Sequence, residues 1–207
     1  MERLVQPILL VMGLVPLLVL MVGLITEHLG ANPAEMLIHQ TGLWALRLLM
    51  LTLSVTPLVR ITGWSILNIR YNLRRLLGLY AFFYASLHLL SYLLFDHYFA
   101  WQEIIEDILT RPVLDVGWLA FILMIPLAIT SYPKLVQRLS PQHWQQLHQL
   151  IYLISFSAIV HFWWLAQAKA DIREPLIYAI IFLILLLLRY PPLLNRLAHK
   201  NVTSTKE

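Results

Sequence analysis

The sequence predicts an all-α integral membrane protein, a bundle of six transmembrane helices with both termini in the cytoplasm. Of the 207 residues, 59% are hydrophobic and 13% are charged, and the mean hydropathy is +0.71. The chain therefore has more apolar surface than a soluble core of this length can bury. Apolar segments of about 20 residues, the length that crosses the hydrocarbon layer, alternate with basic and basic-poor connections. We expect one domain over residues 1–207, with spans at 7–25, 41–61, 75–95, 116–131, 145–166 and 175–190.

The first apolar run extends from Pro7 to Ile25. A secretory signal peptide is the alternative interpretation of this run. Its hydrophobic part would be unusually long, and the GANPA that follows is a poor cleavage site, so we expect an uncleaved first span. The second span contains Pro57 near its end, where a membrane helix tolerates a kink.

The connecting segments predict which side of the membrane each helix end faces. Residues 60–75 carry four arginines and no acidic residue, which is the strongest cytoplasmic signal in the sequence. Residues 96–115, between the third and fourth spans, hold five acidic residues and only Arg111, so we expect this loop outside. The turn at residues 132–143 and the segment after the sixth span are basic again, and we expect both in the cytoplasm.

Two histidines lie at matched depth within predicted spans. His88 is eight residues before Asp96 and His161 is eight residues before Lys169, so both should lie roughly 12 Å from the outer surface. An ionisable side chain inside a span is a functional-site hypothesis, and neutral imidazole is the usual nitrogen ligand of haem iron. We expect this pair to hold one iron. The alternative is that each histidine only hydrogen-bonds a neighbouring helix.

His148 lies near the cytoplasmic end of the fifth span, 13 residues before His161. On an ideal helix these two residues are about 140° apart, so they do not share a face. At the depth of His148 the third span offers Arg74 and Arg75 and no histidine. A second haem would therefore have one candidate ligand and no obvious partner. The two arginines could contact haem propionates or simply mark the membrane edge.

Two further histidines lie near the ends of spans. His143 is a candidate for contacting the edge of a cofactor, and a solvated helix end is the alternative. His39 is expected at the outer membrane interface.

The composition excludes several classes of chemistry. There is no cysteine, which removes disulfides, covalently attached haem and thiolate iron–sulfur ligation. No GxGxxG motif is present, and the loops are too short for a nucleotide-binding domain. The net charge of +4 reflects membrane topology and not nucleic-acid binding.

Two hypotheses remain for the histidines within the spans. One is a transmembrane electron conduit, and the alternative is a transporter or structural membrane protein whose histidines serve packing or proton relay. The predicted spans lack the acidic residues that proton relays commonly use, which favours the conduit.

Several motifs carry a family resemblance. They are RRLLGL at Arg74, SLHLLSY at Ser86, LTRP at Leu109 and HWQQLH at His143, followed by His161. With them the chain resembles the MsrQ (YedZ) family, the haem-bearing membrane subunits of bacterial methionine sulfoxide reductase systems. The resemblance runs from GANPAEMLIHQTG to the LRY that closes the sixth span. The chain also resembles the transmembrane part of ferric reductases and NADPH oxidases.

The resemblance implies cofactors, location and partners. It implies b-type haem with His88, His148 and His161 as the matching histidines, a bound FMN, and a place in the bacterial inner membrane. Such a subunit is not itself catalytic. It takes electrons from the quinone pool or a cytosolic flavin reductase and delivers them to MsrP, a periplasmic molybdenum subunit that reduces methionine sulfoxide in oxidised envelope proteins. We expect MsrP to dock on three outer loops, Glu27–Gln40, Asp96–Asp115 and Gln167–Glu174.

Overall fold

The computed structural model describes residues 2–62 and 73–190, and side chains from residue 8 onward. Every regular element in this part of the chain is a helix. The elements are α1 (Glu2–Ile25), α2 (Pro33–Thr62), α4 (Leu73–Ser91), the π-helix η1 (Tyr92–Asp96), α5 (Trp101–Thr110), α6 (Pro112–Ile129), α7 (Pro133–Val136), α8 (Pro141–His148), α9 (Leu150–Ala168) and α10 (Arg173–Leu188).

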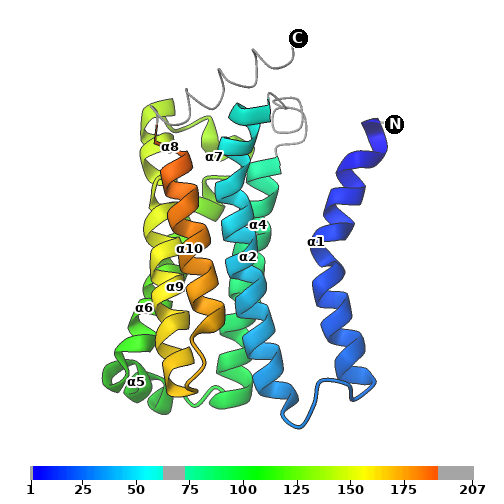
Figure 1. Ribbon diagram of the computed structural model, residues 1–207, viewed down its shortest axis with the longest axis vertical. Coiled ribbons are helices and arrows are strands. Elements are labelled where there is room, and N and C mark those ends of the chain that lie inside the picture. Colours follow the sequence, from blue (N-terminus) through cyan, green and yellow to red (C-terminus); the bar gives the residue numbers. More distant parts are fainter. Residues whose placement is uncertain (1, 63–72, 191–207) are drawn as a thin grey trace.

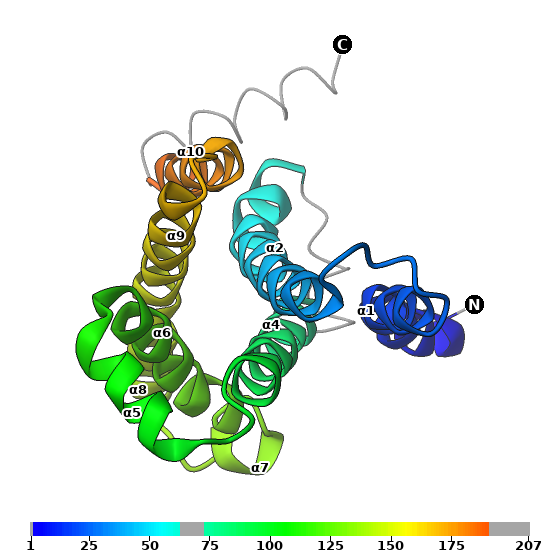
Figure 2. The ribbon, with the colours of Figure 1, turned by 90° about the horizontal axis from the view of Figure 1, so that it is seen from below.

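The long helices stand side by side and alternate in direction (Figure 1). α2 packs along α4, and α6 packs along α9, so the bundle consists of two helix pairs that face each other. Viewed along the helices, α10 closes the side between α2 and α9, and α1 stands apart beyond α2 and α4 (Figure 2). α1 begins and α10 ends at the same end of the bundle.

Five helical segments of the described chain are long and apolar enough to cross a membrane. They are Ile8–Ile25, Pro33–Thr62, Leu73–Asp96, Pro112–Ile129 and Pro141–Ala168. α10 is apolar but has 16 residues, or about 24 Å at 1.5 Å per residue, which is shorter than the roughly 30 Å hydrocarbon layer. The chain is therefore a helical multi-pass membrane protein, and its sixth span remains a prediction.

Helix starts lie earlier in the sequence than expected because short capping motifs extend them. α2 begins at Pro33 and not near residue 41. The Asn32 side chain accepts a hydrogen bond from the Glu35 amide (3.2 Å), and Pro33 occupies the first helical position, where its missing N–H costs nothing. α6 likewise begins at Pro112. Most of the predicted loop Glu27–Gln40 is thus helix.

The fifth predicted span is divided at Gln149. The amide of this residue donates to the Gln146 carbonyl, and Tyr152 donates to the Gln149 carbonyl, both at 3.1 Å. The Gln149 amide also donates to the Gln145 carbonyl at 3.1 Å, as in a regular α-helix, and Gln149 keeps helical dihedral angles (φ −68°, ψ −19°). The turn is therefore a local tightening of a nearly continuous helix, and Pro141–Ala168 acts as one membrane-length segment.

α1 is attached to α4 through tyrosine hydroxyls. The fully buried Tyr84 donates to the Gly13 carbonyl (2.9 Å) and accepts from the Leu17 amide (3.1 Å). Tyr80 donates to the Leu10 carbonyl (2.6 Å). The Tyr84 hydroxyl thus stands between the Leu17 amide and the Gly13 carbonyl, which would bond each other in a regular helix. This insertion lies next to Pro16, which has no N–H to donate.

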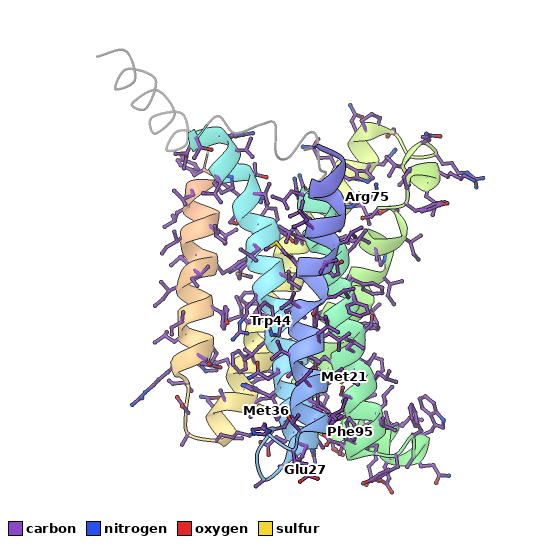
Figure 3. All side chains as sticks on the ribbon, turned by 90° about the vertical axis from the view of Figure 1, so that its right-hand side faces the viewer. Met21, Glu27, Met36, Trp44, Arg75 and Phe95 are labelled. Carbon is purple, nitrogen blue, oxygen red and sulfur yellow. The ribbon has the colours of Figure 1, made fainter. Side chains whose placement is uncertain are left out.

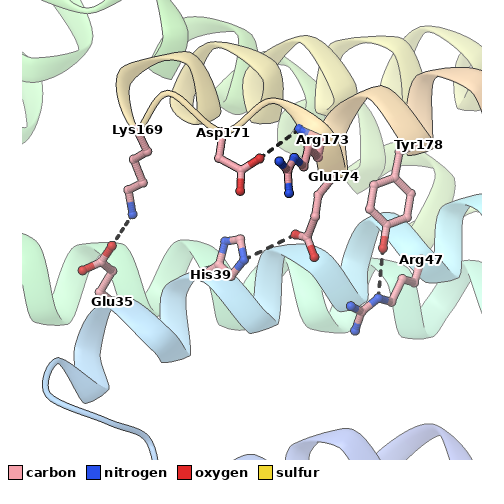
Figure 4. Close-up of polar contacts among 8 residues, drawn as sticks. All are labelled: Glu35, His39, Arg47, Lys169, Asp171, Arg173, Glu174 and Tyr178. Atoms are coloured by element: carbon pink, nitrogen blue, oxygen red, sulfur yellow. Dashed lines mark hydrogen bonds and ion pairs between the residues drawn. The ribbon is translucent and has the colours of Figure 1, made fainter.

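The two ends of the bundle differ in charge. Figure 3 shows Arg75 at one end and Glu27 with Phe95 at the other. The end with Arg75 also holds the end of α2, α7, α8 and the end of α10, whereas α5 and its acidic residues lie at the opposite end (Figure 1). We call these the basic end and the acidic end. At the acidic end, polar contacts join α2 to the segment around the start of α10, namely Glu35 with Lys169 and His39 with Glu174 (3.7 Å) (Figure 4).

Candidate cofactor site

His88 and His161 meet in the interior of the bundle. His88 comes from α4 and His161 from α9, one from each helix pair, and their ring centroids are 6.2 Å apart with an interplanar angle of 80°. With metal–nitrogen bonds of about 2 Å, two imidazoles on opposite sides of one metal ion have ring centres roughly 6 Å apart. The spacing of the two rings therefore fits axial ligation of a single iron.

Each ring is held by a backbone carbonyl of the partner helix in its pair. Nδ1 of His88 lies 2.8 Å from the Ile38 carbonyl of α2, and Nδ1 of His161 lies 2.8 Å from the Val113 carbonyl of α6. A carbonyl only accepts, so Nδ1 carries the proton in both rings. This fixes the tautomer in which Nε2 has the free lone pair, and such a second hydrogen bond is what orients histidine ligands of metals.

A glycine gives each ring access to its carbonyl. Gly42 follows Ile38 by one helical turn, and a Cβ built on it would lie 2.9 Å from His88 Nδ1. Gly117 stands in the same relation to Val113, and its Cβ would lie 2.8 Å from His161 Nδ1. The two halves of the site thus use one device, a helical carbonyl with a glycine four residues later. Neither glycine was singled out from the sequence, because its role depends on a histidine from another helix.

His148, Arg74 and Arg75 share a cavity nearer the basic end. The cavity measures about 550 Å³, within the range of cofactor and ligand sites, and it is bounded by both helix pairs. Its walls include Thr52, Arg74, Arg75, Gly78, Met124 and His148. His148 therefore lines an interior cavity together with residues of α2, α4 and α6. Nδ1 of His148 lies 3.0 Å from the Trp144 carbonyl, and its ring stacks on the Trp144 ring at 4.0 Å, so Nε2 is again the nitrogen left to bind a ligand.

His143 and His39 lie away from these positions. His143 is exposed, and its Nδ1 is 2.8 Å from Ser140 Oγ, which caps α8. It lines neither of the two cavities described here. His39 is 41% exposed and faces Glu174. Among the described residues, no group of three or more His, Asp or Glu side chains is arranged to hold a metal ion without a porphyrin.

Two arginines of the bundle interior were not singled out by the sequence analysis. Arg47 lies in the middle of α2, stacks over Trp44 (4.9 Å) and donates from Nε to the Tyr178 hydroxyl (3.0 Å) (Figure 4). Arg189 lies at the end of α10 and donates to the Leu53 carbonyl (2.7 Å). Charged residues at helix ends serve equally well as topology signals, so the sequence did not distinguish Arg189 from its exposed neighbours.

Comparison with known proteins identifies the family. A family model described as ferric reductase like transmembrane component matches residues 41–159. The chain is 44% identical over 186 residues to the protein-methionine-sulfoxide reductase heme-binding subunit MsrQ of Herminiimonas arsenicoxydans, which covers 90% of this chain and 84% of that protein. It is 52% identical over 161 residues to MsrQ of Xanthomonas campestris pv. campestris strain 8004, covering 78% and 71%. The chain belongs to the MsrQ family. No solved structure matches it significantly.

The region matched by the family model contains most of the residues of the interior site. Residues 41–159 include Gly42, His88, Gly117 and His148, and His161 lies just beyond their end.

Proposed function

We propose that this chain is a transmembrane electron conduit that binds b-type haem and passes electrons to the catalytic subunit of a methionine sulfoxide reductase. The relatives in the MsrQ family are named heme-binding subunits of such a reductase. The observation that carries the proposal is the His88–His161 pair, whose 6.2 Å spacing and matching Nδ1 contacts suit one iron between two axial imidazoles.

The residues of the pair provide ligation and orientation. Haem iron supplies the one-electron chemistry. The Ile38 and Val113 carbonyls hold each ring in a single tautomer and raise the basicity of Nε2. A histidine that served only helix packing could use both ring nitrogens for hydrogen bonds to other helices. Here only Nδ1 of each ring makes such a bond, and in the described chain neither Nε2 has a hydrogen-bond partner.

A second cofactor position is proposed in the 550 Å³ cavity. His148 is its candidate ligand, and Arg74 and Arg75 are its candidate partners for haem propionates. A carboxylate near these guanidinium groups would form charge-assisted hydrogen bonds, which are stronger than neutral ones. The cavity is lined by residues from the start of α4, from α7 and from α8, which lie toward the basic end, so it would be a stepping point for electrons that enter from that side.

The charge difference between the ends gives the proposed direction. Because Lys and Arg collect on the cytoplasmic side of membrane proteins, the basic end faces the cytoplasm and the acidic end faces the periplasm of a bacterial inner membrane. Both termini are then cytoplasmic. The basic end is then the side at which the quinone pool or a cytosolic flavin reductase would supply electrons, and the acidic end is the side at which they would leave. FMN, where bound, would supply flavin redox chemistry at the basic end.

The acidic end is the proposed docking surface for the catalytic subunit. Not every acidic side chain of α5 is available for docking. Asp107 is 17% exposed and pairs with His97 (3.1 Å) and Arg111 (3.3 Å). Glu103 is 69% exposed, and its carboxylate lies 3.8 Å from His97 Nδ1; Glu106 is exposed. We therefore assign the electrostatic part of docking to Glu103 and Glu106, and a structural role to Asp107.

An absorption spectrum of the purified protein tests the proposal. Protein expressed with full haem supply should show a Soret band that sharpens on reduction with dithionite. A colourless protein under the same conditions would instead favour a transporter or a structural membrane protein with packing histidines.

A further inference from the structure

A smaller cavity opens at the basic end beside the larger one. It measures about 250 Å³ and is walled by polar groups. Three arginines from three different elements line it: Arg60 of α2, Arg74 of α4 and Arg189 at the end of α10. The positive-inside rule explains basic residues at one membrane face. It does not require that guanidinium groups from distant parts of the sequence line the same cavity.

Arg189 is fixed in place by the backbone of α2. Pro57 has no N–H, so the Leu53 carbonyl one turn earlier has no helical donor. Nη2 of Arg189 fills this position at 2.7 Å. Nη1 donates to the Tyr152 hydroxyl at 2.5 Å, and the guanidinium group lies 5.3 Å from the centre of the Tyr152 ring. Its Nε is buried and has no hydrogen-bond partner. The guanidinium group is thus held in place, and the second N–H bond of each Nη nitrogen is left for a ligand.

No protein carboxylate neutralises this cluster. Among the described residues, no ion pair involves Arg60, Arg74 or Arg189, and Arg74 and Arg189 are close enough for their charges to repel. In the sequence, residues 63–72 contain no Asp or Glu, and residues 191–207 contain only Glu207. Partly buried like charges are costly unless an opposite charge compensates them, so the cluster calls for an anion from outside the chain.

We propose that Arg60, Arg74 and Arg189 form a binding site for a phosphate monoester. A phosphate monoester carries about −1.5 to −2 charges at pH 7 and three terminal oxygens, which suits three guanidinium groups that line one cavity. A lipid phosphodiester has one charge and fewer free oxygens, and it matches the cluster less well. The carrier of the phosphate rests on the proposed function, in which the flavin is FMN. The anion site itself rests on the geometry.

Flavin titration tests the site, because FMN and riboflavin differ only by the phosphate. Haem-loaded protein in nanodiscs of neutral phosphatidylcholine is titrated with each flavin, and binding is followed by flavin fluorescence. The wild-type protein should bind FMN at least about tenfold more tightly than riboflavin, the effect of one or more charge-assisted hydrogen bonds. Inorganic phosphate should compete with FMN and not with riboflavin.

Two variants and a control locate the effect. Arg60→Gln and Arg189→Gln should lose most of the preference for FMN while riboflavin binding stays unchanged. Arg189→Lys, which keeps the charge, should retain part of it. Arg60 is exposed at the end of α2, so its substitution keeps the test valid if loss of the Arg189–Leu53 contact impairs folding. Arg138→Gln removes an exposed charge at the same end outside the cavity and should keep the full preference.

Three results would overturn the inference. The first is equal binding of FMN and riboflavin by the wild-type protein. The second is displacement of FMN when phosphatidylglycerol replaces part of the phosphatidylcholine in the nanodisc, which would assign the cluster to a lipid headgroup. The third is loss of haem instead of flavin in Arg60→Gln, which would assign it to haem carboxylates. In each case an unchanged haem spectrum of the wild-type protein would leave the proposed conduit standing, so the two failures are distinguishable.

Discussion

Gly117→Ala tests whether the carbonyl contact of His161 holds the ligand geometry. The added Cβ would lie 2.8 Å from both Nδ1 and Cε1 of His161, closer than a carbon atom approaches a ring without displacement. The ring must therefore move, and its 2.8 Å contact with the Val113 carbonyl is lost or bent. Loss of an outer-shell partner of a metal-binding histidine costs roughly 10–100-fold in metal affinity, or about 1.4–2.7 kcal/mol.

The assay is haem per protein together with the low-spin signal of the oxidised form in electron paramagnetic resonance. Gly117→Ala should show reduced haem content and a changed or heterogeneous low-spin signal. Gly42→Ala should do the same through His88, where the added Cβ would lie 2.9 Å from Nδ1. Gly78→Ala is the control for the low-spin signal of the His88–His161 pair. It is also a helical glycine, and the nearest atom to its added Cβ is 3.9 Å away on Thr52. It lines the 550 Å³ cavity and contacts neither ring of the pair.

The control separates ring displacement from a change in helix stability. A Gly→Ala substitution in a helix interior normally stabilises the helix by about 1 kcal/mol, so a loss of haem in Gly117→Ala cannot come from helix propensity. Haem content and low-spin signals that are the same in Gly42→Ala, Gly78→Ala and Gly117→Ala would refute the reasoning about the two carbonyl contacts.

Three further predictions concern topology, docking and the attachment of α1. A reporter active only in the periplasm should give no signal when fused after residue 207, and a strong signal there would contradict the cytoplasmic C-terminus. Charge reversal of Glu103 and Glu106 to Lys should slow electron delivery to the catalytic subunit severalfold at low salt and leave the haem spectrum unchanged; equal rates would exclude an electrostatic role for α5. Tyr84→Phe should destabilise the docking of α1 by roughly 1–3 kcal/mol because two hydrogen bonds are lost, which faster proteolysis within α1 would report, whereas an unchanged cleavage rate would argue that lipid alone holds α1 in place.

The fold class was predictable because the bilayer imposes it. A lipid environment requires helices of about 20 apolar residues, and five such segments are present where runs of apolar residues predicted them. The helix boundaries were less accurate. The NPAE sequence at Asn32 is a capping signal that hydropathy alone does not weigh, because it precedes the apolar run.

The meeting of His88 and His161 was predictable from their depth. His88 lies eight residues before Asp96 and His161 lies eight residues before Lys169, at the outer ends of their predicted spans. Two helices that run in the same direction with equal rise per residue bring such residues to the same depth. The structure places their rings 6.2 Å apart. Whether they bind haem remains a prediction.

The cavity that His148 shares with Arg74 was not predictable from one helix, because its walls come from several helices. Similarly, the roles of Gly42 and Gly117 depend on side chains about 45 residues away in the sequence, and one sequence contains no direct sign of such pairs.

The measurement that tests the central proposal most directly compares haem per protein and the reduced absorption spectrum of His88→Ala, His148→Ala and His161→Ala side by side. The proposed pair predicts that His88→Ala and His161→Ala each abolish or severely perturb the main low-spin haem signal, whereas His148→Ala lowers haem content only in part and blocks electron entry from the basic end. A protein that keeps a normal spectrum in His88→Ala and loses its haem in His148→Ala would contradict the proposal.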